Sequence, residues 1–144
     1  MNNRWTAEDA AKFSATTKRL AAQFSDNIVA PGVHANGDLT LGENIADQGG
    51  LSVAFEAMKL AIGNKQDKID NLTPAQRFFI AYARLWGQNI TEQEILRRTK
   101  TDPHSLGDLR VNQALKNVTA FHEAFSTKPG DKMYLAPEKR IVVW

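Results

Sequence analysis

Three threonine-led helix starts restrict this chain to a mainly helical fold. Thr6 precedes a first turn with two acidic residues, which suits the positive end of a helix dipole. Thr73 is followed by Pro at the first helical position and by Gln three residues on, and Thr91 has Glu at the same spacing. Both are capping-box patterns, in which the threonine and the later side chain each bind a backbone N–H. We expect helices from all three points, the first ending near residue 25 and the last near Lys100.

The rest of the pattern adds further helices and little sheet. A helix is expected over about 42–62, and two more near 108–116 and 117–126. The stretch 30–41 contains Pro-Gly and Asn-Gly steps, which predict tight turns and a short hairpin. We therefore expect one domain, residues 1–144, that is mainly α-helical with irregular loops and an extended C-terminal tail whose apolar end pairs or packs.

Composition and charge exclude several classes of protein. Hydrophobic residues make up 42% and charged residues 24% of the 144, which is typical of a folded globular domain. The net charge is +2 with both signs interspersed, so the sequence does not indicate a nucleic-acid partner. The most basic stretch, Arg97, Arg98 and Lys100, is expected to be a solvated helix end. The absence of cysteine excludes disulfides and cysteine-ligated metal sites, and no signal peptide is visible.

The most informative stretch, residues 36–50, contains a pair of carboxylates. Glu43 and Asp47 are four residues apart, so on a helix they share one face about 6 Å apart along the axis. Like charges at this spacing repel unless a cation or another positive group lies nearby. A Gly-Gly pair in the same helix costs about 1 kcal/mol per glycine relative to alanine, which indicates a close approach to the backbone. Two solvated surface acids are the alternative, but the glycines and the apolar residues between the acids count against it.

A second group of polar residues lies in a loop and at the start of the helix that follows. Asp102 and His104 are in the loop, and Arg110 is in the helix. Taken alone, such a histidine is usually a hydrogen-bonded surface residue, and such an arginine is usually an ion-pair partner. Upstream, Leu85 and Trp86 end an aromatic helix, and plain core packing is one interpretation of these two residues.

Two of these segments resemble motifs of a known family. Residues 36–51, Asn-Gly-Asp-Leu-Thr-Leu-Gly-Glu-Asn-Ile-Ala-Asp-Gln-Gly-Gly-Leu, are similar to the third-ligand motif of the neprilysin family of zinc endopeptidases, which includes bacterial oligopeptidase O and the endothelin-converting enzymes. Residues 101–112 resemble that family's Asp-x-His-Ser-Pro-Gly-x-x-Arg-Val-Asn-Gly pattern, with Leu106 where Pro is usual. The resemblance implies the C-terminal portion of a gluzincin catalytic domain, a zincin fold, with one Zn²⁺ ion in the full-length enzyme.

The resemblance also implies a role for each candidate residue. Glu43 is the third zinc ligand, and Asp47 orients a zinc-bound histidine supplied from elsewhere, as ligating histidines require. The catalytic His104, oriented by Asp102, stabilises the oxyanion of the tetrahedral intermediate. Arg110 hydrogen-bonds a substrate backbone carbonyl. The remaining substrate-binding residues, which shape the pocket for the side chain after the cleaved bond, are Leu85 and Trp86.

One essential motif is missing from the chain. A zincin needs His-Glu-x-x-His, in which the glutamate is the general base. Besides His104, the histidines are His34 and His122, and the His-Glu pair at His122 has no second histidine after it. We expect both to be surface residues. The chain is thus expected to be a fragment that is inactive alone, from an exported parent that cleaves oligopeptides.

Partners follow from this hypothesis, and so do its rivals. The expected partners are a peptide substrate and the N-terminal part of the catalytic domain that carries HExxH. Apolar surface left uncovered in such a half-site could also support a homo-oligomer. The first rival is a non-catalytic helical binding module, which predicts that Glu43, Asp47, His104 and Arg110 do not converge on one cavity. The second, a nucleic-acid-binding protein, needs a clustered basic face that the sequence lacks.

Overall fold

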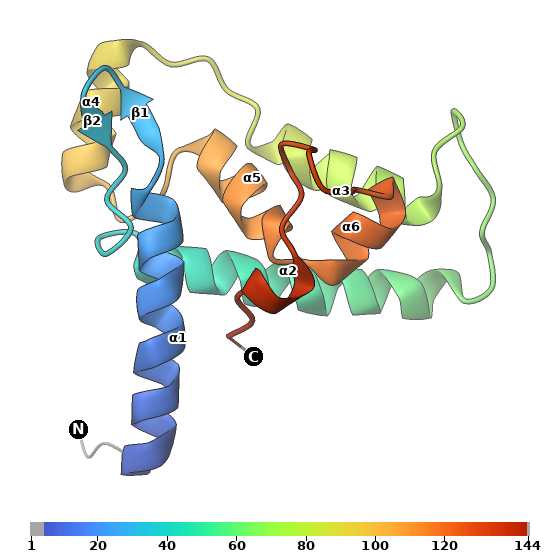
Figure 1. Cartoon of the computed structure of the whole chain (residues 1–144). Coiled ribbons are helices and arrows are strands. Elements are labelled where there is room, and N and C mark those ends of the chain that lie inside the picture. The colour runs from blue at the N-terminus through green and yellow to red at the C-terminus, as the bar shows by residue number, and fades with distance from the viewer. Residues whose placement is uncertain (1–4, 144) are drawn as a thin grey trace.

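The computed structural model describes residues 5–143 and confirms a mainly helical fold. One long helix, α2, runs along one side, and α3, α5 and α6 lie over it (Figure 1). The elements in chain order are α1 (Ala7–Ser25), β1 (Ile28–Ala30), β2 (Val33–His34), α2 (Leu41–Ile62), α3 (Pro74–Leu85), α4 (Glu92–Thr101), α5 (Gly107–Lys116), α6 (Thr119–Phe125) and the 3-10 helix η1 (Pro137–Lys139).

The helix starts follow the predicted caps, with one difference. The Thr6 hydroxyl accepts from the backbone N–H of Asp9, and both bonds of the capping box at Thr73 are formed. At Thr91 only half of the box is present, because the hydroxyl accepts from Glu94 N–H without a return bond. The Glu94 carboxylate pairs instead with Arg97 and Arg98, which lowers its pKa to about 2. Two guanidinium groups within one helical turn therefore outcompete a neutral backbone N–H for this carboxylate.

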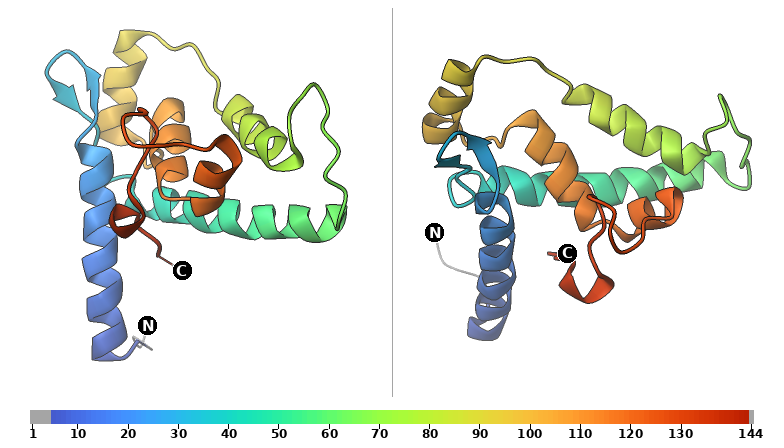
Figure 2. Two further views of the ribbon diagram at one scale, coloured as in Figure 1. Left: turned by 45° about the vertical axis from the view of Figure 1, so that its right-hand side comes forward. Right: turned by 45° about the horizontal axis from the view of Figure 1, so that its top comes forward.

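Helix α5 connects two hydrophobic clusters. Its C-terminal residues Ala114 and Leu115 belong to one cluster, together with Leu51 of α2, Phe79 of α3 and Phe121 of α6. Its Leu109 belongs to the other, which contains residues of α1 and the tail. Because α5 is held from both sides, the side chains of its first turns have a fixed position relative to α2. The second half of α1 takes part in this packing, whereas its first half projects from the body (Figure 2).

The link between α1 and α2 contains the predicted hairpin. Strands β1 and β2 pair antiparallel, with Ile28 opposite His34. His34 is exposed as expected. Farther along, a Cβ at Gly37 would collide with the carbonyl oxygen of Ala21, so only glycine lets this loop lie against α1. The Gly37 N–H donates to the Ser25 hydroxyl at 3.0 Å, which fixes where α2 begins.

The C-terminal tail packs on the body of the fold. Ile141 is buried, and its N–H donates to the Asn117 side chain.

The expectation that His122 is a surface residue was wrong, because its exposed fraction is 6%. Its ring nitrogens contact the Thr127 hydroxyl at 2.6 Å and the Lys116 carbonyl at 2.9 Å. Both ring nitrogens thus have partners within the fold, which is what allows this histidine to be buried.

Candidate active site

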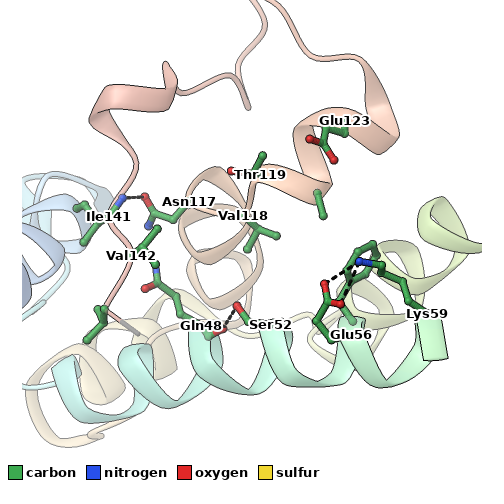
Figure 3. A pocket seen from close by; sticks show the side chains of 13 residues that line it. Gln48, Ser52, Glu56, Lys59, Asn117, Val118, Thr119, Glu123, Ile141 and Val142 are labelled. Atoms are coloured by element: carbon green, nitrogen blue, oxygen red, sulfur yellow. Dashed lines mark hydrogen bonds and ion pairs between the residues drawn. The ribbon is translucent and has the colours of Figure 1, made fainter. Parts of the chain in front are cut away.

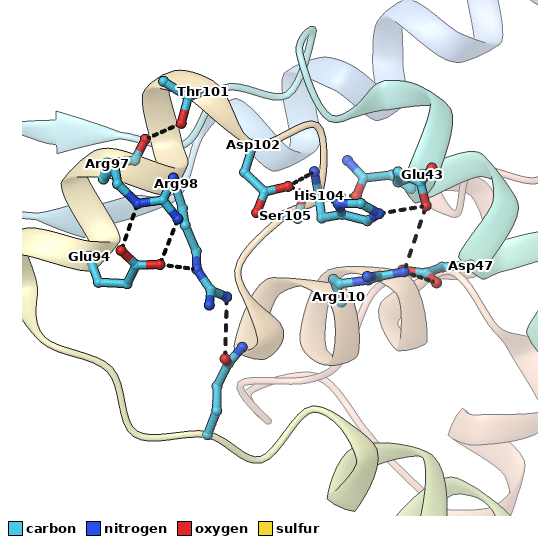
Figure 4. Close-up of polar contacts among 12 residues, drawn as sticks. Glu43, Asp47, Glu94, Arg97, Arg98, Thr101, Asp102, His104, Ser105 and Arg110 are labelled. Carbon is cyan, nitrogen blue, oxygen red and sulfur yellow. Dashed lines mark hydrogen bonds and ion pairs between the residues drawn. The ribbon is translucent and has the colours of Figure 1, made fainter.

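The predicted polar residues come together beside the N-terminal half of α2 (Figure 4). Glu43 and Asp47 project from the same face of α2, His104 comes from the loop before α5, and Arg110 comes from α5 itself. His104 Nε2 lies 3.4 Å from a Glu43 carboxylate oxygen, and Arg110 Nη2 lies 4.0 Å from the same oxygen. Residues far apart in the sequence therefore meet at one place.

Arg110 supplies the positive charge that the carboxylate pair needs. Its guanidinium donates two hydrogen bonds to Asp47, at 2.7 and 2.8 Å. These bonds raise the pKa of Arg110. One face of the guanidinium lies 3.7 Å from the ring centroid of Trp86, a cation–π contact. Both charged side chains are almost buried, with exposed fractions of 10% for Arg110 and 12% for Asp47. This ion pair is therefore a largely dry part of the site.

Tyr82 of α3 lies beside this ion pair. Its hydroxyl donates to the Arg110 backbone carbonyl at 3.2 Å. Burial, and then the Asp47 charge, raise the pKa of Tyr82 to about 12. The tyrosine is thus a neutral donor at physiological pH.

The His104 ring is oriented by its own loop. The Asp102 carboxylate accepts from the His104 backbone N–H at 2.9 Å and lies 2.8 Å from ring Nδ1. The hydrogen bonds from His104 lower the pKa of Asp102. Because Nδ1 lies beside Asp102, Nε2 is the ring atom that faces Glu43. His104 and Glu43 are half-exposed, at 47% and 41%, so this side of the site is open to solvent.

Leu85 and Trp86 are adjacent in the sequence but lie in different surroundings. Leu85 is 76% exposed and lines an apolar hollow of about 420 Å³ between α2 and α3. Trp86 is half-buried and lines another hollow, of about 460 Å³, beside the start of α5. Among the described residues these neighbours therefore line different hollows, and Trp86 contacts Arg110.

A further hollow, of about 390 Å³, lies between α2 and the C-terminal tail (Figure 3). Gln48, Ser52 and Asn117 are among its polar lining residues. None of the candidate site residues lines it. It is therefore separate from the site at Glu43.

The sequence did not reveal two buried polar residues at the site. Asn44, next to Glu43, is fully buried, and Ser105, next to His104, is also buried. The Ser105 hydroxyl donates to the Asn44 side-chain oxygen at 2.8 Å. Their bond joins residues 61 apart in the sequence, so the one sequence signal for each was its position next to a candidate site residue.

The donors present fit one part of a zinc site. Within residues 5–143, no group of three or more His, Asp or Glu side chains is arranged to hold a metal ion. Glu43 has a half-exposed carboxylate, which suits a single ligand whose partners come from other segments.

The Gly-Gly pair of α2 was expected to allow a close approach of another segment to the backbone. At Gly50, a Cβ would meet nothing within 4 Å, so no described residue of this chain makes that approach there.

Comparison with known proteins defines the family. The sequence model of peptidase family M13 matches residues 1–141, and the chain therefore belongs to this family. It is 34% identical to a neutral endopeptidase of Lactococcus lactis, over 100% of this chain and 21% of the relative. It is 35% identical to neprilysin of Homo sapiens, over 97% of this chain and 19% of the relative. The resemblance to the neprilysin family is confirmed.

Solved structures agree. The zinc metalloprotease Zmp1 of Mycobacterium tuberculosis, in complex with an inhibitor, matches with a TM-score of 0.93 and 36% identity, over 99% of this chain and 23% of that one. The fold is thus that of the C-terminal part of a zincin catalytic domain of this family. The chain spans about a fifth of the length of the relatives. Within residues 5–143, every helix is too short or too polar to cross a lipid bilayer.

Proposed function

We propose that this chain supplies part of the active site of a zinc-dependent endopeptidase that cleaves oligopeptides. The convergence of Glu43, His104 and Arg110 on one face carries the proposal. These residues arise from α2, a loop and α5, yet contacts of 3.4 and 4.0 Å link them. The relatives support it, since they are named as peptidases and one as a zinc metalloprotease.

Each side chain has a role that its surroundings suit. Glu43 is one ligand of the zinc, which when bound polarises a carbonyl and activates water. As the imidazolium, with a proton on both ring nitrogens, His104 donates from Nε2 to the developing oxyanion and from Nδ1 to Asp102. Arg110 binds a backbone carbonyl of the substrate. Asp47 already accepts two bonds from Arg110, but a carboxylate has about four acceptor positions, so it retains room for the N–H of a ligating histidine.

The other ligands and the general base are proposed to come from the N-terminal part of the catalytic domain, with its HExxH segment. The free side of α2 supports this assignment, because exposed apolar residues recur along it at helical spacing. Val53 is 72% exposed and Leu60 is 84% exposed. A helix that is apolar on more than one face is normally buried in a larger protein. We propose that the rest of the domain covers this face and the apolar hollow at Leu85, completing the zinc site there.

A chimera tests the function directly. The segment of the Lactococcus lactis neutral endopeptidase that matches this chain is replaced by it, and cleavage of a fluorogenic oligopeptide is measured with and without a chelator. We expect chelator-sensitive cleavage. Glu43→Gln should lower both the zinc content and the activity, the latter by at least about 100-fold. Glu56→Gln, also on α2 but exposed and paired with Lys59, should leave both unchanged.

Failure would favour the alternative, a helical binding module that kept the peptidase scaffold. An inactive chimera that folds, or one in which Glu43→Gln has no effect, would refute the proposed role.

Two other expectations, export of the parent protein and self-association, remain predictions. Export of the parent is tested by cell fractionation. Self-association through the exposed apolar face is tested by sedimentation of the 144-residue chain, with Leu60→Lys as the variant that should abolish it.

A further inference from the structure

A chain of buried hydrogen bonds links α2 to the loop that carries His104. The Ser105 hydroxyl donates to Asn44 Oδ1 at 2.8 Å, and Asn44 Nδ2 donates to the Thr40 hydroxyl at 3.0 Å. The Thr40 hydroxyl donates in turn to the carbonyl of Asn36 at 3.0 Å. Each hydroxyl uses its one proton, so the chain runs in one direction from the loop to the turn before α2.

The position of this chain of bonds relates it to the proposed chemistry. Asn44 is adjacent to Glu43, and Ser105 is adjacent to His104. Consecutive Cα atoms are about 3.8 Å apart. The bond between Asn44 and Ser105 therefore fixes, within one residue on each side, the separation of the proposed metal ligand from the proposed oxyanion donor.

Burial makes the link strong and selective. Asn44 has an exposed fraction of 0%, and Thr40 and Ser105 are also buried. Water cannot replace a lost partner there without opening the packing, so each polar group needs its protein partner. The contacts between Asp102 and His104, by contrast, lie within the loop itself. They orient the His104 ring but do not place the loop on α2.

We propose that Asn44 and Ser105 are positioning residues, which hold His104 at its working distance from Glu43. This inference rests on the proposed function for its catalytic consequence, while the placement itself concerns this chain alone. Neither residue touches the substrate or the metal in this role. They act through the side chains next to them.

The first test uses the 144-residue chain and does not depend on activity. A nuclear Overhauser effect between the His104 ring protons and the Glu43 side chain should be present in the wild type, since the nearest heavy atoms are 3.4 Å apart. Ser105→Ala and, from the other end, Asn44→Ser should weaken or abolish it. Ser52→Ala is the matched control, because its hydroxyl bonds only within α2. Ser105→Thr, which keeps the hydroxyl, should retain the effect.

The second test measures kinetics in the chimera with the L. lactis neutral endopeptidase. Ser105→Ala should lower kcat by roughly 10–100-fold with little change in KM, less than removal of an oxyanion donor itself. Ser105→Thr should recover most of kcat, and Ser52→Ala should match the wild type.

The outcomes separate the two proposals. An unchanged Overhauser effect in both Ser105→Ala and Asn44→Ser would overturn the positioning role, as would an unchanged kcat in an active chimera. An inactive wild-type chimera would instead count against the proposed function, and the nuclear Overhauser measurement on the chain would still decide the positioning role.

Discussion

Removal of the Asp47 carboxylate is expected to destabilise the chain by about 3 kcal/mol. Breaking a buried ion pair from one side costs about 3–5 kcal/mol, because it leaves an uncompensated charge. Arg110, at 10% exposed, is such a charge. Two contacts remain to it in Asp47→Ala, the Trp86 ring at 3.7 Å and the Glu43 carboxylate at 4.0 Å. A desolvated cation–π contact contributes about 2 kcal/mol, which places the expected loss at the lower end of the range.

The double variant makes this reasoning sharper. Arg110→Met alone leaves the Asp47 carboxylate without its two hydrogen bonds. Asp47→Ala combined with Arg110→Met leaves no stranded charge, so its loss should be smaller than the sum of the two single losses. We expect a coupling free energy of about 2 kcal/mol or more.

Urea unfolding followed by far-UV circular dichroism gives the free energies. The control cycle is Glu56→Ala with Lys59→Met, a pair on the surface of α2 with exposed fractions of 64% and 54%. Its coupling should be below about 1 kcal/mol. If the Asp47–Arg110 coupling is no larger than that of the control, the ion pair does not stabilise the site as argued.

Three other changes have distinct signatures. Trp86→Leu should lower stability by about 1–2 kcal/mol more than Trp86→Phe, which keeps an aromatic face; thermal unfolding measures the difference. Gly37→Ala should cost about 2 kcal/mol or more through its backbone collision, whereas Gly50→Ala should stabilise the isolated chain by up to about 1 kcal/mol; equal effects on Tm would contradict the packing. Because the pKa of Tyr82 is raised from 10.0 to about 12, its stabilising contribution is complete below pH 10 and lost as the pH rises through 12; Tyr82→Phe should flatten this fall in urea titrations.

Local features of this fold were predictable from the sequence, because their causes lie within a few residues. The capping box at Thr73 is made by Thr73 and Gln76 alone, and the helix expected over about 42–62 is observed over Leu41–Ile62. The burial of His122 was not predictable, since it depends on Thr127 and on the Lys116 carbonyl coming together around the ring. A histidine in a polar context is exposed unless such partners form, and tertiary contacts decide that.

For the candidate site, too, some features could be predicted from the sequence and others required the tertiary structure. The sharing of one helix face by Glu43 and Asp47 follows from their spacing. The pairing of Asp47 with Arg110 required knowledge of how α5 crosses α2. Leu85 and Trp86 line different hollows, because adjacent residues of a helix point about 100° apart, and their assignment to a substrate pocket stays a prediction. Leu85 accordingly faces solvent beside α2, and Trp86 turns toward Arg110.

One side of the site has its charges paired within the chain and the other is open to solvent. We therefore expect a substitution on the open side to change activity but not stability. The Arg110–Asp47 side is dry and paired within the chain, whereas Glu43 and His104 are half-exposed. Glu43→Gln should therefore change the unfolding free energy of the isolated chain by less than about 0.5 kcal/mol, as expected at an exposed position. The same substitution should lower zinc-dependent cleavage in the chimera by at least about 100-fold. A large stability loss in the isolated chain would mean that Glu43 already has its partners there, and the metal-ligand assignment would fail.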